Sequence, residues 1–137
     1  KGTRAHFYDL HQTVADKTRA AHDRKEQGNR LIALGAYGAA LWKYTEALRC
    51  VEYEETDDPE EFVDVTTYGT ERIPSSALVK LLDLKASLHL NSATGHHRQG
   101  HPKLAIASCD EALKVRPSSV KALYKRSVLH LERGDHV

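Results

Sequence analysis

Apolar residues in the first quarter of the chain recur every three or four positions, which is the spacing of one face of a helix. No proline interrupts residues 5–34, and Gly35 is a suitable stop because glycine tolerates a left-handed backbone. The pattern predicts one long helix or two helices in tandem. Its apolar positions are Leu10, Val14, Ala21, Leu31 and Leu34.

A partner helix is expected from about Tyr37 to Glu55, since a second set of apolar residues follows at the same spacing. Trp42 and Tyr53 on this helix are interpreted as packing or partly exposed residues. The inward stripe would consist of Ala40, Leu41, Tyr44, Ala47, Leu48 and Val51.

Residues 56–75 have a different composition. Acidic residues surround Pro59 at the start of this segment, and Tyr68-Gly69 and Pro74 interrupt the rest. The segment is predicted to be a mobile loop. No strand pairing is expected anywhere between residues 22 and 134.

Three further helices are predicted after this segment. The first covers about residues 76–99 and is rich in leucine. The second covers about residues 102–115 and begins with proline, which is favourable in a first helical turn. The third ends near residue 133, and Ser118 or Ser119 can cap its start.

The small residues of these helices repeat at a fixed interval. Ser127 and Gly134 follow Ala93 and Gly100 by 34 residues. Near the front of the chain, residues of the same kinds stand 65 positions before the markers of the unit that begins at Ala93. Since 65 is one repeat plus 31, an extra segment of 31 residues separates the first two units. The markers at the front are Gly28, Gly35, Ala40, Tyr44 and Ala47, which match Ala93, Gly100, Ala105, Cys109 and Ala112.

A period of 34, with small residues where paired helices cross, is the signature of a tetratricopeptide repeat (TPR). The predicted fold class is therefore all-α, an antiparallel helix-turn-helix solenoid of about two and a half repeats with an N-terminal helical extension. The extension covers residues 1–21 and the TPR domain residues 22–137. The domain divides into repeat one (22–55), an inserted loop (56–75), repeat two (76–117) and half of repeat three (118–137).

The last predicted helix has no partner in this sequence. Its stripe of Leu123, Val128 and Leu131 should therefore be less buried than the leucines of the helix before residue 99. The chain also lacks methionine and begins with Lys1. We expect it to be a fragment of a longer protein.

Overall charge and composition add a few exclusions. The 20 basic and 19 acidic residues give a formal charge of +1, so no global field favours nucleic acid. No apolar run reaches the length of a membrane span. Cys50 and Cys109 lie on apolar stripes, and we interpret them as two small buried residues of a reduced, cytoplasmic domain rather than a redox pair.

The first helix of each repeat lines the concave groove of such a solenoid. Lys25 and Asn29 are four residues apart on the first of these helices, and Lys121 and Lys125 are four apart on the third. Asn91 lies two residues before the small residue Ala93 on the second. Three ammonium groups and two amides facing one groove favour an extended, carboxylate-rich peptide.

These five positions carry a specific resemblance. Lys25, Asn29, Asn91, Lys121 and Lys125 resemble the carboxylate clamp of chaperone-binding TPR domains. The segments Lys-Glu-Gln-Gly-Asn at 25–29, Asn-Ser-Ala at 91–93 and Lys-Ala-Leu-Tyr-Lys-Arg at 121–126 match the clamp motifs. The layout is most similar to the C-terminal TPR domain of FKBP-type immunophilins and to the related aryl-hydrocarbon-receptor-interacting proteins.

The resemblance implies a co-chaperone module that binds the Glu-Glu-Val-Asp tail of a cytosolic heat-shock chaperone. It favours the 90-kDa class over the 70-kDa class and adds client proteins as further partners. The fragment itself is not expected to be an enzyme, whereas its parent would be a peptidyl-prolyl cis-trans isomerase. The family usually has arginine where this chain has Lys125, and lysine lacks the planar fork that grips a carboxylate.

Other interpretations remain open. The domain could be a scaffold that binds another acidic or helical segment without a working clamp, and helical lysines are commonly only solvated charges. His96, His97 and His101 form a histidine-rich patch, but they fall across a helix end and a turn, so no metal site is expected. The sequence has no motif for a phosphate loop or a catalytic nucleophile, and no cofactor is expected.

Overall fold

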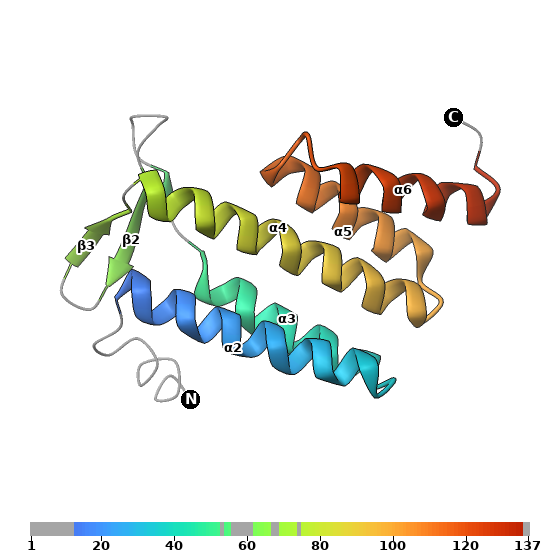
Figure 1. Cartoon of the computed structure of the whole chain (residues 1–137), viewed down its shortest axis with the longest axis horizontal. Coiled ribbons are helices and arrows are strands. Elements are labelled where there is room, and N and C mark those ends of the chain that lie inside the picture. The colour runs from blue at the N-terminus through green and yellow to red at the C-terminus, as the bar shows by residue number, and fades with distance from the viewer. Residues whose placement is uncertain (1–12, 53, 56–61, 67–68, 74, 136–137) are drawn as a thin grey trace.

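The computed structural model describes residues 13–52, 54–55, 62–66, 69–73 and 75–135. The described part is dominated by antiparallel helices, with a small sheet at one end of the molecule (Figure 1). The helices are α2 (Val14–Ala33), α3 (Tyr37–Cys50), α4 (Ser75–Arg98), α5 (Pro102–Val115) and α6 (Val120–Arg133). The strands are β1 (Glu54–Glu55), β2 (Phe62–Thr66) and β3 (Gly69–Arg72).

Local signals explain where α2 and α6 begin and end. Thr13 and Asp16 form a capping box at the start of α2, with two hydrogen bonds of 3.2 Å between side chain and backbone. Ser119 caps α6, since its hydroxyl accepts a hydrogen bond from the Ala122 amide (3.2 Å). Gly134 ends α6 at φ +78°, a left-handed conformation that favours glycine. Of the two serines that could cap this helix, the structure uses Ser119.

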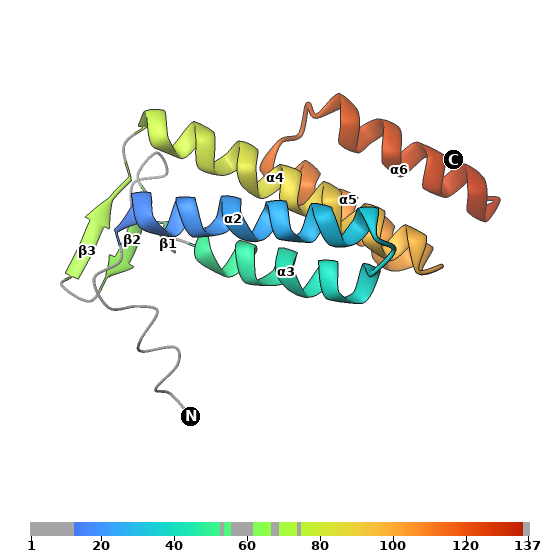
Figure 2. The same ribbon diagram turned by 60° about the horizontal axis from the view of Figure 1, so that its bottom comes forward.

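The helices pair as two helical hairpins, α2 with α3 and α4 with α5, and α6 packs on α5 (Figures 1 and 2). This arrangement confirms the all-α TPR solenoid of about two and a half repeats. α2 crosses residues 21–22 without a break, and the predicted helix over residues 5–12 lies outside the described residues. No helix in the described part of the chain is both long and apolar enough to cross a membrane.

Small residues at the predicted positions form the helix crossings. Gly28, Ala40 and Ala47 are buried between α2 and α3, and Ala93 and Ala105 are buried between α4 and α5. At Gly28 an added Cβ would lie 2.5 Å from Cε1 of Tyr44, closer than atoms can pack, so glycine is required there. Two hydrophobic clusters result, one around Tyr44 and Leu88 and one around Cys109 and Leu129.

The partner helix and the inserted segment differ from the sequence-based expectation. α3 ends at Cys50 rather than near Glu55, and β1 occupies the residues predicted as the end of that helix. The segment predicted as a loop contains β2 and β3, which complete an antiparallel sheet in the order β1-β2-β3. The expectation of no strand pairing between residues 22 and 134 was therefore wrong. The sheet lies between α3 and α4, so both helix pairs are intact.

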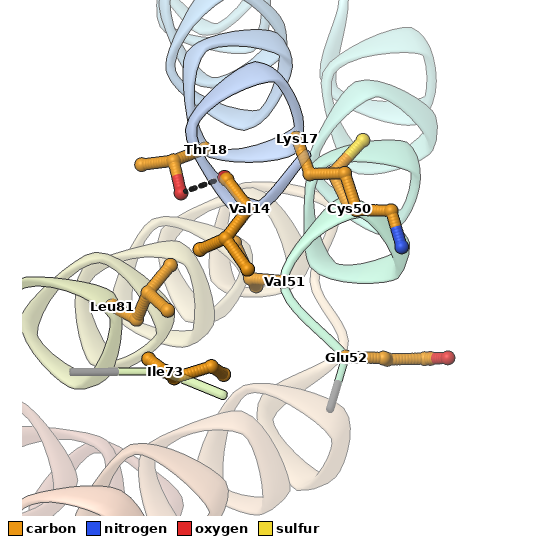
Figure 3. A pocket seen from close by; sticks show the side chains of 8 residues that line it. All are labelled: Val14, Lys17, Thr18, Cys50, Val51, Glu52, Ile73 and Leu81. Atoms are coloured by element: carbon orange, nitrogen blue, oxygen red, sulfur yellow. Dashed lines mark hydrogen bonds between the residues drawn. The ribbon is translucent and has the colours of Figure 1, made fainter. Parts of the chain in front are cut away.

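Two physical reasons account for this difference. Val51 is buried, and it lies beside Ile73 and Leu81 at a small cavity where the ends of α2, α3 and α4 meet (Figure 3). Val51 is the C-cap of α3, and its amide donates to the Leu48 carbonyl over 3.1 Å in a tighter turn that ends the helix. Val63 and Val65 then alternate with polar residues, a pattern that favours a strand over a loop.

The burial of α6 agrees with its predicted lack of a partner. Leu123 is 40% exposed and Leu131 74% exposed, and Val128 is half-buried. By contrast, Leu81 and Leu88 of α4 are 3% and 0% exposed. The prediction for this helix is confirmed.

Candidate functional site

Asn29 of α2 and Asn91 of α4 meet across the interface between the two repeats. Asn91 Nδ2 donates a hydrogen bond to Asn29 Oδ1 over 2.9 Å. The hydroxyl of Tyr44, from α3, donates to the same oxygen over 2.6 Å. Because Oδ1 of Asn29 accepts both bonds, its Nδ2 is left to donate to a ligand.

Tyr44 is a supporting residue that the sequence indicated only as a repeat marker and as part of the inward stripe of its helix. Its side chain is 1% exposed, and burial raises the pKa of its hydroxyl to about 12, so it remains a donor at neutral pH. The contact depends on Gly28, one residue before Asn29, which lets the ring approach α2 closely. In the sequence, the available signal for this contact was the bulky Tyr44 at a position opposite Gly28 in the helix pair.

Lys121 and Lys125 of α6 line one side of an open hollow of about 260 Å³. Lys121 is exposed and Lys125 is half-buried. Neither forms an ion pair within the described residues. The hollow is lined by His97, Lys121, Tyr124, Lys125, Val128 and Leu129.

Lys25 lies one turn before Asn29 on α2 and is half-buried. It has no hydrogen-bond or ion-pair partner in the described part of the chain, so its ammonium group is available. The structure thus brings the two asparagines into contact and places two lysines at one hollow. No hydrogen bond or ion pair joins these two groups to each other, or to Lys25, among the described residues.

Arg126 follows Lys125 and could supply the missing guanidinium only if it faced the groove. Instead its Nη1 lies 2.9 Å from Oδ1 of Asp110 on α5. This ion pair engages the guanidinium elsewhere, so Lys125 is the cation that α6 offers beside Lys121.

The side chains of the histidine patch have different surroundings in the structure. Burial and the neighbouring His101 lower the pKa of His96, which favours its neutral form, and its Nδ1 is buried with no hydrogen-bond partner in the described residues. His97 instead lines the hollow, and its Nε2 lies 2.8 Å from Oε1 of Glu132 on α6. The described residues contain no cluster of three or more side chains that could hold a metal ion.

Sequence reasoning missed His97, Tyr124 and Glu132 as residues of this region. His97 was interpreted together with its neighbours in the sequence. Its partner Glu132 lies 35 residues away, close to one repeat length, which is the spacing that brings equivalent positions of successive helices side by side.

Cys50 and Cys109 are both free thiols, Cys109 buried and Cys50 half-buried. Burial raises the pKa of each thiol, which favours the protonated, unreactive form. Cys109 is thus buried as the sequence indicated, whereas Cys50 is only half-buried.

Comparison with known proteins decides the family. No protein-family model matches the chain. A solved structure, the C-terminal TPR-containing domain of an FK506-binding protein from Plasmodium falciparum, superposes with a TM-score of 0.69 at 30% sequence identity, covering 90% of this chain and 72% of that one. The chain belongs to the TPR domains of FK506-binding proteins.

Curated relatives of this TPR domain agree. FK506-binding protein 5 from Rhizopus delemar is 25% identical over 130 residues, covering 95% of this chain and 30% of the relative. Peptidyl-prolyl cis-trans isomerase FKBP4 from Mus musculus is 28% identical over 121 residues, covering 88% of this chain and 23% of the relative. The TPR domain thus spans less than a third of the length of these relatives, and their names describe the whole proteins.

A second solved structure shares only the fold of the TPR domain. The first TPR of Spaghetti (RPAP3), bound to the HSP90 peptide SRMEEVD, superposes with a TM-score of 0.59 at 20% identity, covering 85% of this chain and 70% of that one. A TPR domain is a protein-interaction fold, in which stacked helix pairs present a concave surface to a partner.

Proposed function

We propose that this TPR domain binds the acidic C-terminal tail of a cytosolic heat-shock chaperone of the 90-kDa class. Lys25, Asn29, Asn91, Lys121 and Lys125 would form the carboxylate clamp. The observation that carries the proposal is the Asn29–Asn91 contact of 2.9 Å, because it aligns amide donors from two repeats in one groove. The peptide bound to Spaghetti ends in the same Glu-Glu-Val-Asp sequence, which supports this class of ligand.

The geometry suits two carboxylates at the end of a peptide. Lys25 and the Nδ2 group of Asn29 lie one turn apart on α2 and can hold the terminal aspartate, whereas Lys121 and Lys125 reach the chain from α6. Charge-assisted hydrogen bonds contribute about 1.5–3 kcal/mol each. Two or three of them are enough to make binding depend on the terminal carboxylate.

The proposal also includes the cellular setting. A cytosolic chaperone tail requires a cytoplasmic domain, and the 70-kDa class and client proteins are further partners to test. Isomerase activity, which the names of the relatives carry, would belong to the parent protein outside these 137 residues.

The test is calorimetry with the peptide SRMEEVD as the free acid and as the C-terminal amide. We expect the amide to bind at least about ten-fold more weakly, since it removes one carboxylate charge. Lys103→Ala is the matched control for lysine variants, because Lys103 is exposed on α5 and lies outside the three helices of the groove. Equal affinity for acid and amide would contradict the clamp.

The alternative is a scaffold that binds another acidic or helical segment. The exposed apolar side chains of α6 favour it, since Val120 is 77% and Leu131 74% exposed. A scaffold of this kind would bind its partner equally well after Lys25 and Lys121 are both replaced by alanine.

A further inference from the structure

The contact between His97 and Glu132 joins two of the helices that carry the proposed groove. His97 lies in the last turn of α4, six residues after Asn91, and Glu132 lies in the last turn of α6. Their Nε2 and Oε1 atoms are 2.8 Å apart, and the side chains are 32% and 54% exposed. Partly exposed pairs of this kind are held weakly, so another carboxylate can replace Glu132.

His97 also lines the hollow that holds Lys121 and Lys125. One imidazole and two ammonium groups therefore surround the same space. Within the described residues, Glu132 is the only carboxylate that forms a hydrogen bond or ion pair with any of the three. The free domain thus keeps one carboxylate at the place where an acidic peptide would bring its own.

We propose that His97 is a sixth contact for the acidic tail, and that Glu132 occupies it until the peptide binds. This inference rests on the proposed clamp and adds a residue to it. A tail carboxylate would replace Oε1 of Glu132 at Nε2 of His97, in the hollow that Lys121 and Lys125 also line. Glu132, more than half exposed, would turn into solvent.

The exchange makes binding depend on pH. Imidazolium holds a carboxylate more strongly than neutral imidazole, and histidine ordinarily titrates near pH 6.5. The charged groups of α6 that face His97 are Glu132, at 2.8 Å, and Lys121 and Lys125, which line the same hollow. No charged residue of α2, α3 or α5 forms a hydrogen bond or ion pair with His97 in the described part of the chain.

The sign follows from the charges in the complex. The tail of SRMEEVD carries four carboxylates, of which one would replace Glu132, so binding brings a net gain of negative charge to the hollow and favours the uptake of a proton there. Tail affinity should therefore rise as the pH falls from about 8 to about 6, where the carboxylates of the tail are still ionised.

The experiment is calorimetry of SRMEEVD binding to the 137-residue chain at pH 6, 7 and 8. We expect Glu132→Gln to tighten binding about two- to five-fold, and His97→Gln to weaken it by a similar factor at pH 6 and to abolish the pH dependence. The matched control is His130→Gln, because His130 also contacts a carboxylate, that of Asp135, over 2.8 Å but does not line the hollow. It should keep the pH dependence.

Failure of this inference can be distinguished from failure of the clamp. If Lys121→Ala abolishes binding but His97→Gln keeps both the affinity and the pH dependence, His97 is not a contact and the clamp stands. Weaker binding by Glu132→Gln would also overturn the inference. If a variant loses helical circular dichroism, the inference is tested on the wild-type chain by NMR. The ring-proton resonances of His97 must shift when the peptide is added at about pH 6.5, and unshifted resonances would overturn the inference.

Discussion

At the scale of single residues, the groove depends on a stack of contacts that begins beneath it. Gly28 admits the ring of Tyr44, the Tyr44 hydroxyl orients Asn29, and Asn29 receives Asn91 from the next repeat. The five positions of the proposed clamp could be predicted from the sequence because they lie at fixed offsets within the repeat. The support from Tyr44 could not, because it requires the distance between two helices.

Replacing Gly28 by alanine should destabilise the domain by about 1–3 kcal/mol, since the new Cβ would lie 2.5 Å from a ring atom of Tyr44. Urea denaturation followed by circular dichroism measures this. Gly38→Ala is the control, because an added Cβ there meets only Gln99 Nε2 at 3.5 Å. A loss of stability as large at Gly38 would show that helix crossing is not the cause.

Replacing Tyr44 by phenylalanine removes the hydroxyl that donates to Asn29 and keeps the buried ring. Because a neutral hydrogen bond contributes about 0.5–1.5 kcal/mol, tail affinity should fall roughly two- to ten-fold with the helical content unchanged. Calorimetry with SRMEEVD measures the change. Unaltered affinity would mean that Asn29 needs no support from α3.

Lys125→Arg is expected to tighten tail binding modestly. Arginine keeps the charge and adds the planar fork that can hold a carboxylate with two hydrogen bonds. The neighbouring Arg126 cannot do so while it pairs with Asp110. Calorimetry on this variant and on Lys125→Ala, which should bind more weakly than the wild type, tests the role of the position.

At the scale of elements, the helices were predictable and the sheet was not. Start and stop signals such as Ser119 and Gly134 act within a few residues, so the sequence indicates the ends of α5 and α6 closely. β1 and β2 pair although they are not adjacent in the sequence. The acidic residues around Pro59 are typical of a loop, and this signal was stronger than the strand-like alternation at Val63 and Val65.

The two faces of α6 should respond differently to truncation. Leu129→Ala removes a side chain that is 1% exposed and should cost about 2–5 kcal/mol of unfolding free energy. Leu131→Ala removes one that is 74% exposed and should change stability by no more than about 0.5 kcal/mol. Urea denaturation of the two variants measures both. A large loss at Leu131 would mean that the chain covers this face in solution, for example by self-association.

At the scale of the whole molecule, charge is strongly separated although the total is only +1. Residues 52–72 contain nine acidic residues and one basic residue, a net charge of −8. The rest of the chain contains ten acidic and nineteen basic residues, a net charge of +9. The sheet lies at the end of the helical body away from α5 and α6 (Figures 1 and 2). The acidic insert and a basic groove would act oppositely on an approaching acidic tail.

Replacing residues 54–72 by a short glycine-serine linker, with the buried Ile73 retained, should therefore speed association with the acidic tail at low salt. The insert repels the tail through solvent, and this repulsion is screened beyond about 10 Å at about 0.1 M ionic strength. The gain in association rate should disappear at high salt, while the dissociation rate, set by contacts in the groove, stays the same. Stopped-flow fluorescence with a labelled peptide measures both rates. An association rate equal to that of the wild type at low salt would show that the insert does not influence the approach of the tail.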